Sequence, residues 1–590
     1  MLIEGTRYRW KLSDMDVESP RVAPLARALG VPPLVALLLL QRGLEVPDEA
    51  GSFLAPKLSD LHDPGLLPGA DEAAERMVRA VRDQQPIVIY GDYDVDGITA
   101  SAILWHVLRM AGAAVSCYVP HRIEEGYGLN VQAIRQLAEG VTAPSGQTAR
   151  PLIVSVDCGI TAVEPARAAR DAGVDLIISD HHELSSEQLP DAFAIVHPRL
   201  DGSQYPFGML CGAGVAFKLA WHFCRRLCGS ERVPQTYRDL LLDLLSFAAL
   251  GTVADVVPLV DENRIITWFG LGQIGRTRFP GLNALIRAAK LDQKKIDSFH
   301  VGFVLGPRLN ACGRMGHAEQ AVRLLTDADE TESRDTADFL TSENERRRTT
   351  ELRIFEQAEQ MVREHGLDGA DSRAIVLAQE GWHPGVIGIV AARLVDAFAR
   401  PVIMLNIEGD EAHGSARSVD GVAIHEAIGH CADLLRSFGG HAMAAGLRLD
   451  AANVEPFRRA FTEYVNRQLE ASDLFHTIRI TAETTLDEMS TDMIDQIRRL
   501  TPFGRGNPNP LFTTRARLEG PAQRVGSGGN HLRVPLRQGR RVVYGIGFGL
   551  GDLADDLPSG SDLEVAFEPK VSTYQGQRRP EVHVKDVRRL

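Results

Sequence analysis

The sequence predicts an α/β fold: two α/β domains joined by a long helix, with an all-β barrel at the C-terminal end. In the first part of the chain, short apolar runs alternate with stretches of helical periodicity, which is typical of a parallel sheet covered by helices. A second such alternation follows a helical stretch with few breakers, and the last part reads as short strands separated by turn residues. We expect an N-terminal preamble (1–70), a parallel-sheet domain (71–260), a helical connector (261–365), a second α/β domain (366–470) and a barrel (471–590).

Length, charge and cysteine content restrict the class of protein. A chain of 590 residues is too long for one core, and its net charge of −14 conceals a C-terminal part, from His476, with 17 Lys and Arg against 14 Asp and Glu. An acidic body with a basic tail is compatible with DNA handling. Seven scattered cysteines argue against a disulfide framework. Because no signal peptide or membrane-spanning apolar run is present, we expect a cytoplasmic protein that makes no membrane contact. We also expect the chain to be a monomer.

The elements of the first domain follow one another in a βαβ rhythm. Before it, residues 22–46 have a helical pattern that Pro32 and Pro33 interrupt, and apolar residues at helical spacing mark a helix at 71–82. Strands are then expected at 87–90, 114–119, 152–156 and 176–178, and helices at 98–110, 131–138 and 163–172.

Three carboxylates follow the first of these strands at alternate positions. Asp92, Asp94 and Asp96 precede Gly97, which we expect to break the chain before the next helix. Acids this close repel one another unless cations lie between them, and oxygen ligands suit Mg²⁺ or Mn²⁺. A solvated acidic turn explains the pattern equally well when it is taken alone.

Further acidic residues follow later strands or apolar runs. Asp157 ends the strand at 152–156, Asp180-His181-His182 follows the strand at 176–178, and Asp255 follows an apolar run. Open α/β sheets bind ligands at the carboxyl ends of their strands, so these side chains are expected to converge on one crevice. Four such ends in one domain favour a metal site over solvated loops.

One cysteine cluster raises the alternative of zinc. His222, Cys224 and Cys228 lie on a predicted helix. Buried helical thiols explain the cluster better than a zinc site does.

The second half carries basic and polar residues beside glycines. Arg308 and Arg314 in the segment 306–318 suit phosphate contact, although a capped helix start explains them too. A helix at 331–364 is expected to connect two lobes. In the second α/β domain, with strands at 374–378 and 402–405, glycine-flanked side chains can approach a phosphate backbone; these are His383, Ser415 and Arg417 of a Gly-Ser-Ala-Arg-Ser turn, and His441.

The C-terminal strands surround a basic cluster that contains Arg533, and the loop 501–510 before the second strand contains Arg505. Aromatic side chains in this part can stack bases or fill the barrel core. The strands are expected at 477–481, 512–517, 531–536, 541–547, 563–568 and 581–587, and the aromatic residues are Phe503, Phe512, Tyr544, Phe548 and Tyr574.

Four motifs carry a resemblance to a known family. Gly-Asp-Tyr-Asp-Val-Asp-Gly, Val-Asp-Cys-Gly, Ser-Asp-His-His-Glu and Gly-Thr-Val-Ala-Asp resemble the motifs of the DHH phosphoesterase superfamily. The glycine-flanked motifs of the second α/β domain resemble the DHHA1 domain. From about Phe53 to the end, the chain resembles the RecJ family of bacterial single-strand-specific exonucleases, whose C-terminal region carries an OB fold.

The resemblance implies 5′→3′ digestion of single-stranded DNA in repair and recombination, aided by two Mn²⁺ or Mg²⁺ ions. Asp157 is expected to bridge the ions, His182 to face the scissile phosphate, and Asp180 to orient a histidine. It implies a strand with a 5′ phosphate as substrate, and a single-strand-binding protein and a helicase as partners. The implied metal ligands are Asp92, Asp94, Asp96, Asp157, His181 and Asp255, and the resemblance points to Arg314, Ser415 and Arg417 as the residues that hold the 5′ phosphate. Together with these three, the residues that we expect to contact DNA are Arg308, His383, His441, Arg505 and Arg533.

Other functions remain open at this point. A phosphodiesterase of short oligonucleotides or cyclic dinucleotides shares the DHH and DHHA1 domains, but this chain adds a basic, barrel-like tail. An inorganic pyrophosphatase shares the metal motifs and needs no platform for a strand. A non-catalytic replication scaffold would have no reason to keep five mutually repelling acids together.

Overall fold

The computed structural model describes the chain except for residues 1, 122–124, 127, 143–147, 185–187, 316, 370 and 575, together with the side chains of residues 142, 314, 315, 471 and 574. The described residues form two compact units, each built from separate segments of the chain. The first unit comprises Met1–Gly51, Arg346–Arg499 and Asn509–Leu590, and the second comprises Ser52–Glu345 and Leu500–Pro508.

The second unit contains a five-stranded sheet in the order β4-β3-β7-β8-β9, and every neighbouring pair is parallel, as the sequence predicts. Its strands are β3 (Ile87–Gly91), β4 (Val115–Tyr118), β7 (Leu152–Val156), β8 (Leu176–Ser179) and β9 (Ala194–Val196).

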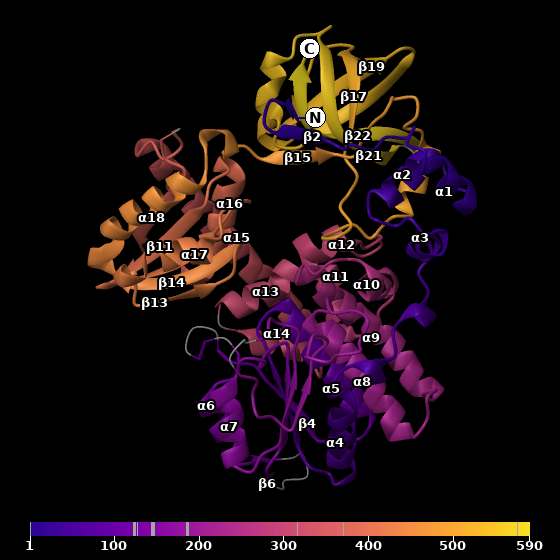
Figure 1. Ribbon diagram of the computed structural model, residues 1–590. Helices are drawn as coiled ribbons and strands as arrows, with labels where there is room; N and C mark the ends of the chain where they lie inside the picture. Colours follow the sequence, from indigo (N-terminus) through magenta and orange to yellow (C-terminus); the bar gives the residue numbers. More distant parts are fainter. Residues whose placement is uncertain are drawn as a thin grey trace. The chain divides into compact units, whose positions relative to one another are not determined.

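Helices cover both faces of this sheet (Figure 1). Strand residues such as Ile153 and Ile178 pack against α6 and α7, whereas Ile89 and Val154 pack against α4, α5 and α8. This alternation explains why the strands read as continuous apolar runs, since both faces are buried. The helices are α4 (Ala70–Arg82), α5 (Val95–Met110), α6 (Val131–Ala138), α7 (Val163–Asp171) and α8 (Gly212–Cys228).

A helical layer completes this unit. It includes a π-helical turn, η3, between α12 and α13, so the glycine-rich segment with Arg308 is helical. The long helix predicted at 331–364 is α15 (Glu330–Glu364), which belongs to this unit as far as Glu345 and to the first unit from Arg346. The others are α9 (Gln235–Ala254), α10 (Asp261–Ile274), α11 (Pro280–Ala288), α12 (Ser298–His300), η3 (Val301–Leu305), α13 (Gly306–Met315) and α14 (Ala318–Leu325).

The first unit contains a second α/β sheet in the order β10-β11-β12-β14-β13. Strands β10 and β11 are parallel and the remaining pairs are antiparallel. The prediction of a turn at Gly-Ser-Ala-Arg-Ser is wrong for all but its last residue, because Gly414 to Arg417 lie on strand β12. Ser415 and Arg417 are two positions apart on this strand and therefore point to the same face of the sheet. The elements are β10 (Ile375–Glu380), α16 (Pro384–Phe398), β11 (Val402–Glu408), β12 (Glu411–Arg417), α17 (Ile424–Gly429), β13 (Ser437–Gly440), β14 (Ala444–Asp450) and α18 (Val454–Gln468).

The C-terminal strands form a sheet in the order β16-β17-β21-β22-β20-β19-β18, and an added β17–β19 pairing closes five of them into a barrel. Phe512 is fully buried and packs on Phe567, so it fills the barrel core and cannot stack a base. The strands are β16 (Ala482–Glu483), β17 (Phe512–Leu518), β18 (Gln523–Val525), β19 (His531–Gln538), β20 (Arg541–Gly547), β21 (Asp562–Tyr574) and β22 (Gln577–Arg589).

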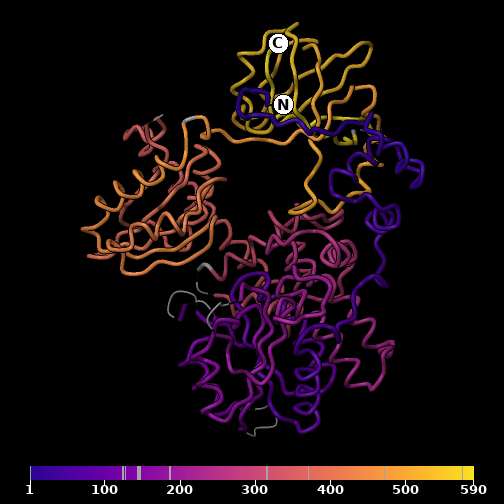
Figure 2. The backbone as a smooth tube through the Cα atoms, in the orientation of Figure 1, coloured from indigo at the N-terminus to yellow at the C-terminus, as the bar shows by residue number. Residues whose placement is uncertain are grey.

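The N-terminal segment is part of the C-terminal structure and not a separate preamble. Strands β1 (Leu2–Glu4) and β2 (Arg9–Leu12) form a sheet with β15 (Thr477–Ile480). Fully buried Trp10 donates its Nε1–H to Asp586 at 2.8 Å. Figure 2 shows the indigo start of the chain beside the yellow end.

Two further expectations concern membranes and charge. No single helix of the described residues is long and apolar enough to cross a membrane. Helices α1 (Val22–Leu29) and α2 (Pro33–Leu40) reach the required length and hydropathy only as a pair bent by 111°, and α2 is almost wholly buried.

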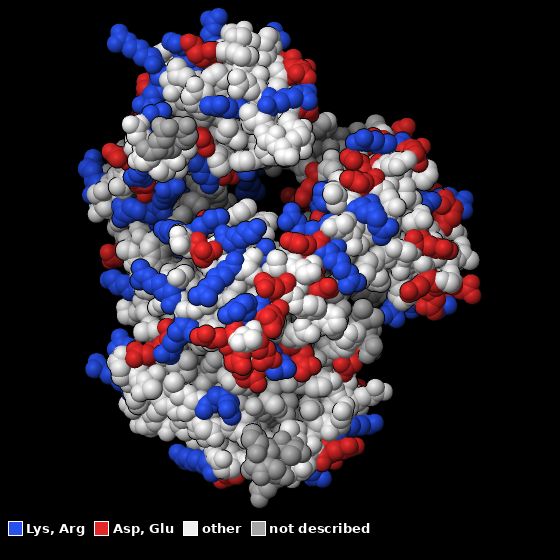
Figure 3. All heavy atoms as spheres, turned by 180° about the vertical axis from the view of Figure 1, so that it is seen from behind, with Lys and Arg blue, Asp and Glu red and all other residues white. Residues whose placement is uncertain are grey.

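Figure 3 shows Lys and Arg at many places on the visible face, with Asp and Glu among them. Basic side chains are therefore not confined to the C-terminal part.

Candidate metal centre

The first acidic motif sits where strand β3 meets helix α5. Asp94 caps this helix, since its Oδ1 accepts hydrogen bonds from the backbone N–H groups of Asp96 (2.9 Å) and Gly97 (3.2 Å). The helix therefore begins before Gly97, and the predicted chain break at this glycine is wrong. A Cβ on Gly97 would lie 2.6 Å from the backbone oxygen of Asp92. The glycine is needed because the helix starts against the strand end.

Asp157 follows strand β7 with a left-handed backbone, at φ 61°. A non-glycine residue in this region is strained, and such strain is concentrated at functional sites. Its carboxylate lies against the start of α8, because a Cβ on Gly212 would clash with Asp157 Oδ1.

The strand ends bring the predicted ligands together. His181 Nε2 lies 3.1 Å from Asp157 Oδ1 and 3.7 Å from a carboxylate oxygen of both Asp96 and Asp255. These distances leave room for a cation between the groups. Three sets of possible ligand atoms, each within 4.8 Å of one another, can be formed: Asp92, Asp94 and Asp157; Asp96, His181 and Asp255; Asp157, His181 and His182.

Asp180 holds the Asp-His-His loop. Its Oδ1 accepts from His182 Nδ1 at 2.7 Å and from the backbone N–H of His181 at 2.7 Å, while Oδ2 accepts from the N–H of Ile160 at 2.9 Å. Burial alone would raise the pKa of Asp180, but the hydrogen bond and charge of His182 lower it to about 2. The same pair raises the pKa of His182 to about 9 against the opposing effect of burial, so the ring carries a charge at neutral pH.

Burial and mutual repulsion raise the pKa of three of the other acids, Asp96, Asp157 and Asp255. Burial and the charge of Asp96 raise the pKa of Asp157 well above its ordinary value, and burial raises the pKa of Asp96 as well. The same two causes raise the pKa of Asp255 to about 8. Carboxylates with this need for positive charge, beside an imidazole, fit divalent metal ions with oxygen and nitrogen ligands.

Helix α8 holds Asp96 in a way that the sequence analysis missed. The backbone N–H groups of Gly212 and Ala213 donate to its two carboxylate oxygens at 2.6 and 2.8 Å. An N-terminal helix turn favours a negative charge, so this contact offsets part of the cost of burying Asp96. The signal in the sequence is weak: Cys211-Gly-Ala-Gly214 reads only as a flexible helix start.

A second missed residue is Arg199, directly after strand β9. Its guanidinium donates to the backbone oxygen of His181 at 2.6 Å, and its backbone N–H donates to His197 Nδ1 at 3.0 Å. His197 in turn contacts the backbone oxygen of His182 at 2.8 Å. Arg199 is thus hydrogen-bonded to the Asp-His-His loop. The sequence pattern that could have predicted it is the run Val-His-Pro-Arg at the end of an apolar strand.

Arg505 lies in the unit of the metal ligands, although the chain before Leu500 and after Pro508 belongs to the first unit. The segment Leu500–Pro508 packs on the residues after Asp255: the N–H of Leu259 donates to the backbone oxygen of Arg505 at 2.7 Å. Asn507 is fully buried and closes the loop on the backbone oxygen of Pro502 at 2.8 Å.

Four of the predicted DNA contacts lie in the second α/β domain, which belongs to the first unit, and they occupy three places. Arg417 donates to Ser415 Oγ at 3.2 Å, and both lie beside Gly388 of α16. His383 caps α16 by accepting from the N–H of Gly385 at 3.1 Å, and it lines a cavity of about 420 Å³ with Trp382. His441 is exposed after β13.

The remaining predicted contacts and aromatic residues are dispersed. The Arg533 guanidinium lies over the ring of exposed Tyr544, 4.7 Å from its centroid, and Phe548 is also exposed. Arg308 of α13 donates to the backbone oxygen of Val304, in the preceding π-helical turn η3, at 2.7 Å. The side chains of Arg314 and Tyr574 lie outside the described residues, and Phe503 is half-buried.

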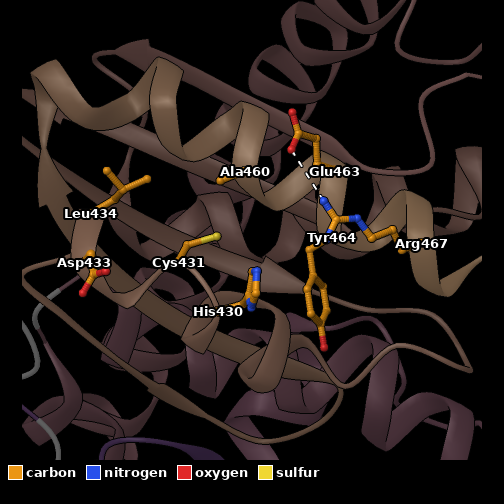
Figure 4. Close-up of a pocket in the computed structure, with 8 residues that line it drawn as sticks. All are labelled: His430, Cys431, Asp433, Leu434, Ala460, Glu463, Tyr464 and Arg467. Atoms are coloured by element: carbon orange, nitrogen blue, oxygen red, sulfur yellow. Dashed lines mark ion pairs between the residues drawn. The ribbon is translucent and has the colours of Figure 1, made fainter.

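Neither the cysteine cluster nor a second cavity contributes to this site. His222 Nε2 is bonded to Asp71 and Cys224 is buried, so this cluster reads as structural. A cavity of about 340 Å³ in the first unit contains none of the predicted site residues (Figure 4). It is lined by His430, Cys431, Asp433, Leu434, Ala460, Glu463, Tyr464 and Arg467.

Comparison with known proteins identifies the family. Three family models match: the N-terminal domain of the DHH family over residues 86–252, the DHHA1 domain over residues 371–467 and the RecJ OB domain over residues 480–586. The single-stranded-DNA-specific exonuclease RecJ of Bacillus subtilis is 37% identical over 584 residues, which cover 99% of this chain and 71% of that relative. The chain belongs to the RecJ family. The RecJ of Thermus thermophilus is 35% identical, and the match covers 95% of this chain and 78% of that relative.

Solved RecJ structures show the same fold. Thermus thermophilus RecJ in complex with Mn²⁺ matches with a TM-score of 0.82 at 31% identity, covering 98% of this chain and 79% of that chain. The complex of the same RecJ with Mg²⁺ matches with a TM-score of 0.75 at 30% identity, covering 98% of this chain and 78% of that chain. The predicted α/β architecture with a C-terminal barrel is confirmed.

Proposed function

We propose that this chain is a metal-dependent exonuclease specific for single-stranded DNA, which digests from the 5′ end and acts in DNA repair and recombination. The observation that carries the proposal is the convergence of buried acids and His181 at one sheet edge, in a chain whose RecJ relatives are named single-stranded-DNA-specific exonucleases. The barrel supports this function over that of a short-oligonucleotide phosphodiesterase or pyrophosphatase, neither of which needs a strand platform.

Two divalent ions, Mn²⁺ or Mg²⁺, would be held by the converging side chains. Asp157 shares one possible ligand set with Asp92 and Asp94, and its Oδ1 lies 3.1 Å from His181 Nε2, which supports the proposal that it would contact both ions. When bound, the ions would supply a water nucleophile of lowered pKa and would stabilise charge on the attacked phosphate. The full set of proposed ligands is Asp92, Asp94, Asp96, Asp157, His181 and Asp255.

His182 and Asp180 act on the substrate side. The charged ring of His182 can donate to a non-bridging phosphate oxygen, where negative charge accumulates during attack. Asp180 is a positioning residue: its hydrogen bond to Nδ1 fixes the ring and leaves Nε2 to face the substrate.

A direct experiment tests the function. End-labelled single strands and duplexes, each with and without a 5′ phosphate, are digested in Mn²⁺ and in Mg²⁺. We expect mononucleotides to be released from the 5′ end of single strands only, with the chain acting as a monomer. Products from the 3′ end would refute the polarity, and digestion of blunt duplexes at the same rate would refute the specificity.

Metal binding should stabilise the protein. Because Mn²⁺ replaces repulsion between the buried acids with attraction, a concentration one hundred times the dissociation constant should add about 2.7 kcal/mol to the free energy of unfolding. The expected result is a rise in Tm that EDTA reverses. Binding should tighten from pH 6 to 8, because metal must displace the proton that Asp255 retains below its pKa of about 8. An unchanged Tm in Mn²⁺ would contradict the metal site.

Arg417 and Ser415 are proposed to recognise the 5′ phosphate. Arg417→Ala should lower kcat/KM roughly ten-fold on 5′-phosphorylated strands, because a charge-assisted hydrogen bond is lost. The loss should be much smaller on 5′-hydroxyl strands, which lack the partner charge. Exposed Arg448 on the neighbouring strand β14 provides the control, Arg448→Ala. Equal losses on both substrates would show that Arg417 does not read the strand end.

The delivery of substrate completes the proposal. A single-strand-binding protein and a helicase would supply the unpaired strand. A pull-down of the purified chain with each of these proteins, with and without DNA, tests this part.

A further inference from the structure

Two arginines border the metal ligands from different parts of the sequence. Arg199 is fixed to the backbone oxygen of His181, and Arg505 lies 3.5 Å from the backbone oxygen of Val256, the residue after Asp255. His181 and Asp255 belong to one ligand set within 4.8 Å, so both guanidiniums lie at the border of the same site. The charge of Arg505 also acts on Asp255, whose pKa it lowers against larger opposing effects.

Each arginine is held in place while part of its guanidinium stays exposed. Both residues are exposed, and neither forms an ion pair with a carboxylate of the described residues. By contrast, Arg170 and Arg225 of the same unit pair with Asp191 and Asp63. A guanidinium has five N–H donors, and the hydrogen bonds to the backbone oxygens of His181 and Val256 use one donor of Arg199 and one of Arg505. The remaining donors can bind phosphate oxygens.

The backbone around each arginine is arranged for this position. The Arg199 side chain passes over Gly208, where a Cβ would lie 3.0 Å from its Cγ. The Arg505 loop packs closely on Pro258 and Leu259, since a Cβ on Gly506 would lie 3.0 Å from Pro258 and one on Gly504 would lie 2.7 Å from Leu259. Both arginines are therefore closely packed against their surroundings, and side chains that are restricted before binding lose less conformational entropy on binding a ligand.

We propose that Arg199 and Arg505 are phosphate-binding residues that grip the DNA phosphates next to the scissile one, on the two borders of the metal centre. This inference rests on the proposed exonuclease function. It names residues that would favour substrates with further phosphates beside the cleaved bond. The need for it is electrostatic: a cluster of acids repels the phosphates on either side of the cleaved bond, and fixed positive charge beside the ligands offsets that repulsion.

Methylphosphonate strands provide the test, because one neutral linkage removes the charge of one phosphate. The variants are Arg199→Gln and Arg505→Gln, with Arg199→Lys and Arg505→Lys to retain charge. The control is Arg170→Gln, an exposed arginine of α7 in the same unit. Single-turnover rates are measured in saturating Mn²⁺ on all-phosphate strands and on strands with one methylphosphonate at each position near the 5′ end.

We expect each glutamine variant to lose roughly ten-fold in kcat/KM on all-phosphate DNA, and to flatten the salt dependence by about 0.7 per lost contact. The kcat/KM of the wild type should fall by a similar factor when the phosphate bound by one of these arginines is replaced with a methylphosphonate. The variant that lacks this arginine should show no further fall in kcat/KM at the same linkage. The Mn²⁺ midpoint should stay within two-fold of the wild type, as should every property of Arg170→Gln.

Three results would overturn the inference. Rates equal to the control would show that the arginines make no contact, and additive losses at every linkage would show that they act elsewhere. Recovery of both variants at higher Mn²⁺ would show that they only support the metal ligands. If the wild type itself fails to digest single strands, the proposed function fails, whereas normal digestion by both variants overturns this inference alone.

Discussion

Asp157→Asn should abolish hydrolysis while single-stranded DNA still binds. If Asp157 holds both proposed ions, its loss removes both the activated water and the charge stabilisation, for which we expect a fall in kcat of at least about 1000-fold. Asparagine is the sharpest substitution because it tolerates the left-handed backbone of this position, with φ 61°, better than alanine does. The rate is measured by single turnover in Mn²⁺ and in Mg²⁺, and DNA affinity by fluorescence anisotropy.

The same variant should be more stable than the wild type in the absence of metal. Burial and neighbouring acids raise the pKa of Asp157 in the folded protein, so its ionisation at neutral pH opposes folding. Removing that charge should raise Tm at pH 7, and the difference should vanish below the ordinary pKa of a carboxyl group, where both states are protonated. The control is exposed Asp201→Asn. Wild-type turnover in Asp157→Asn would refute the bridging role.

The double variant Tyr544→Ala/Phe548→Ala should weaken the binding of long single strands. The two rings are 50% and 60% exposed, and Arg533 lies over Tyr544, so they form a surface on which bases can stack beside a positive charge. Each lost stack costs roughly 1–3 kcal/mol, which predicts a loss of affinity of at least about 30-fold for the pair. Hydrolysis of a very short strand should survive. Affinity is measured by anisotropy over a salt series.

Val542→Ala is the matched control, because Val542 lies on the same strand β20 and is 40% exposed, but carries no ring. Unchanged affinity in the double variant would rule out the platform. Point variants test this surface better than removal of the tail does. Truncation after about Phe475 would also remove the loop that carries Arg505 and the strand β15 that pairs with β2.

The sequence predicted those parts of the molecule whose signal is local. Asp92, Asp157 and His181 were predicted to converge because acids after apolar strands share one edge of a parallel sheet, and the structure brings them together. The start of α5 was placed too late because Gly97 was taken as a breaker. Its actual role is steric, since it allows the helix to approach the backbone of Asp92.

The missed features depend on residues far apart in the chain. The N–H groups of Gly212 and Ala213 reach Asp96 across more than one hundred residues, and no periodicity reports such a contact. The segment Leu500–Pro508 was assigned to the barrel by its position in the sequence, but Leu259 and Asn507 tie it to the metal-binding unit. Propensity and patterning describe neighbours, whereas a loop's place is decided by the surface on which it packs.

The hydrogen bond between Trp10 and Asp586 affects how the chain folds while it is being synthesised. Asp586 accepts from Trp10 Nε1 and also from the backbone N–H groups of Arg7 and Tyr8, both at 3.1 Å. Trp10 and Asp586 are 576 positions apart in the chain, so the ribosome makes them at very different times. At about 5–20 residues per second, the first strands wait roughly 30–120 s for this partner. During that time strand β2 lacks its partner β15 and Trp10 lacks its hydrogen-bond acceptor, so we expect the nascent chain to bind holding chaperones until Asp586 has emerged.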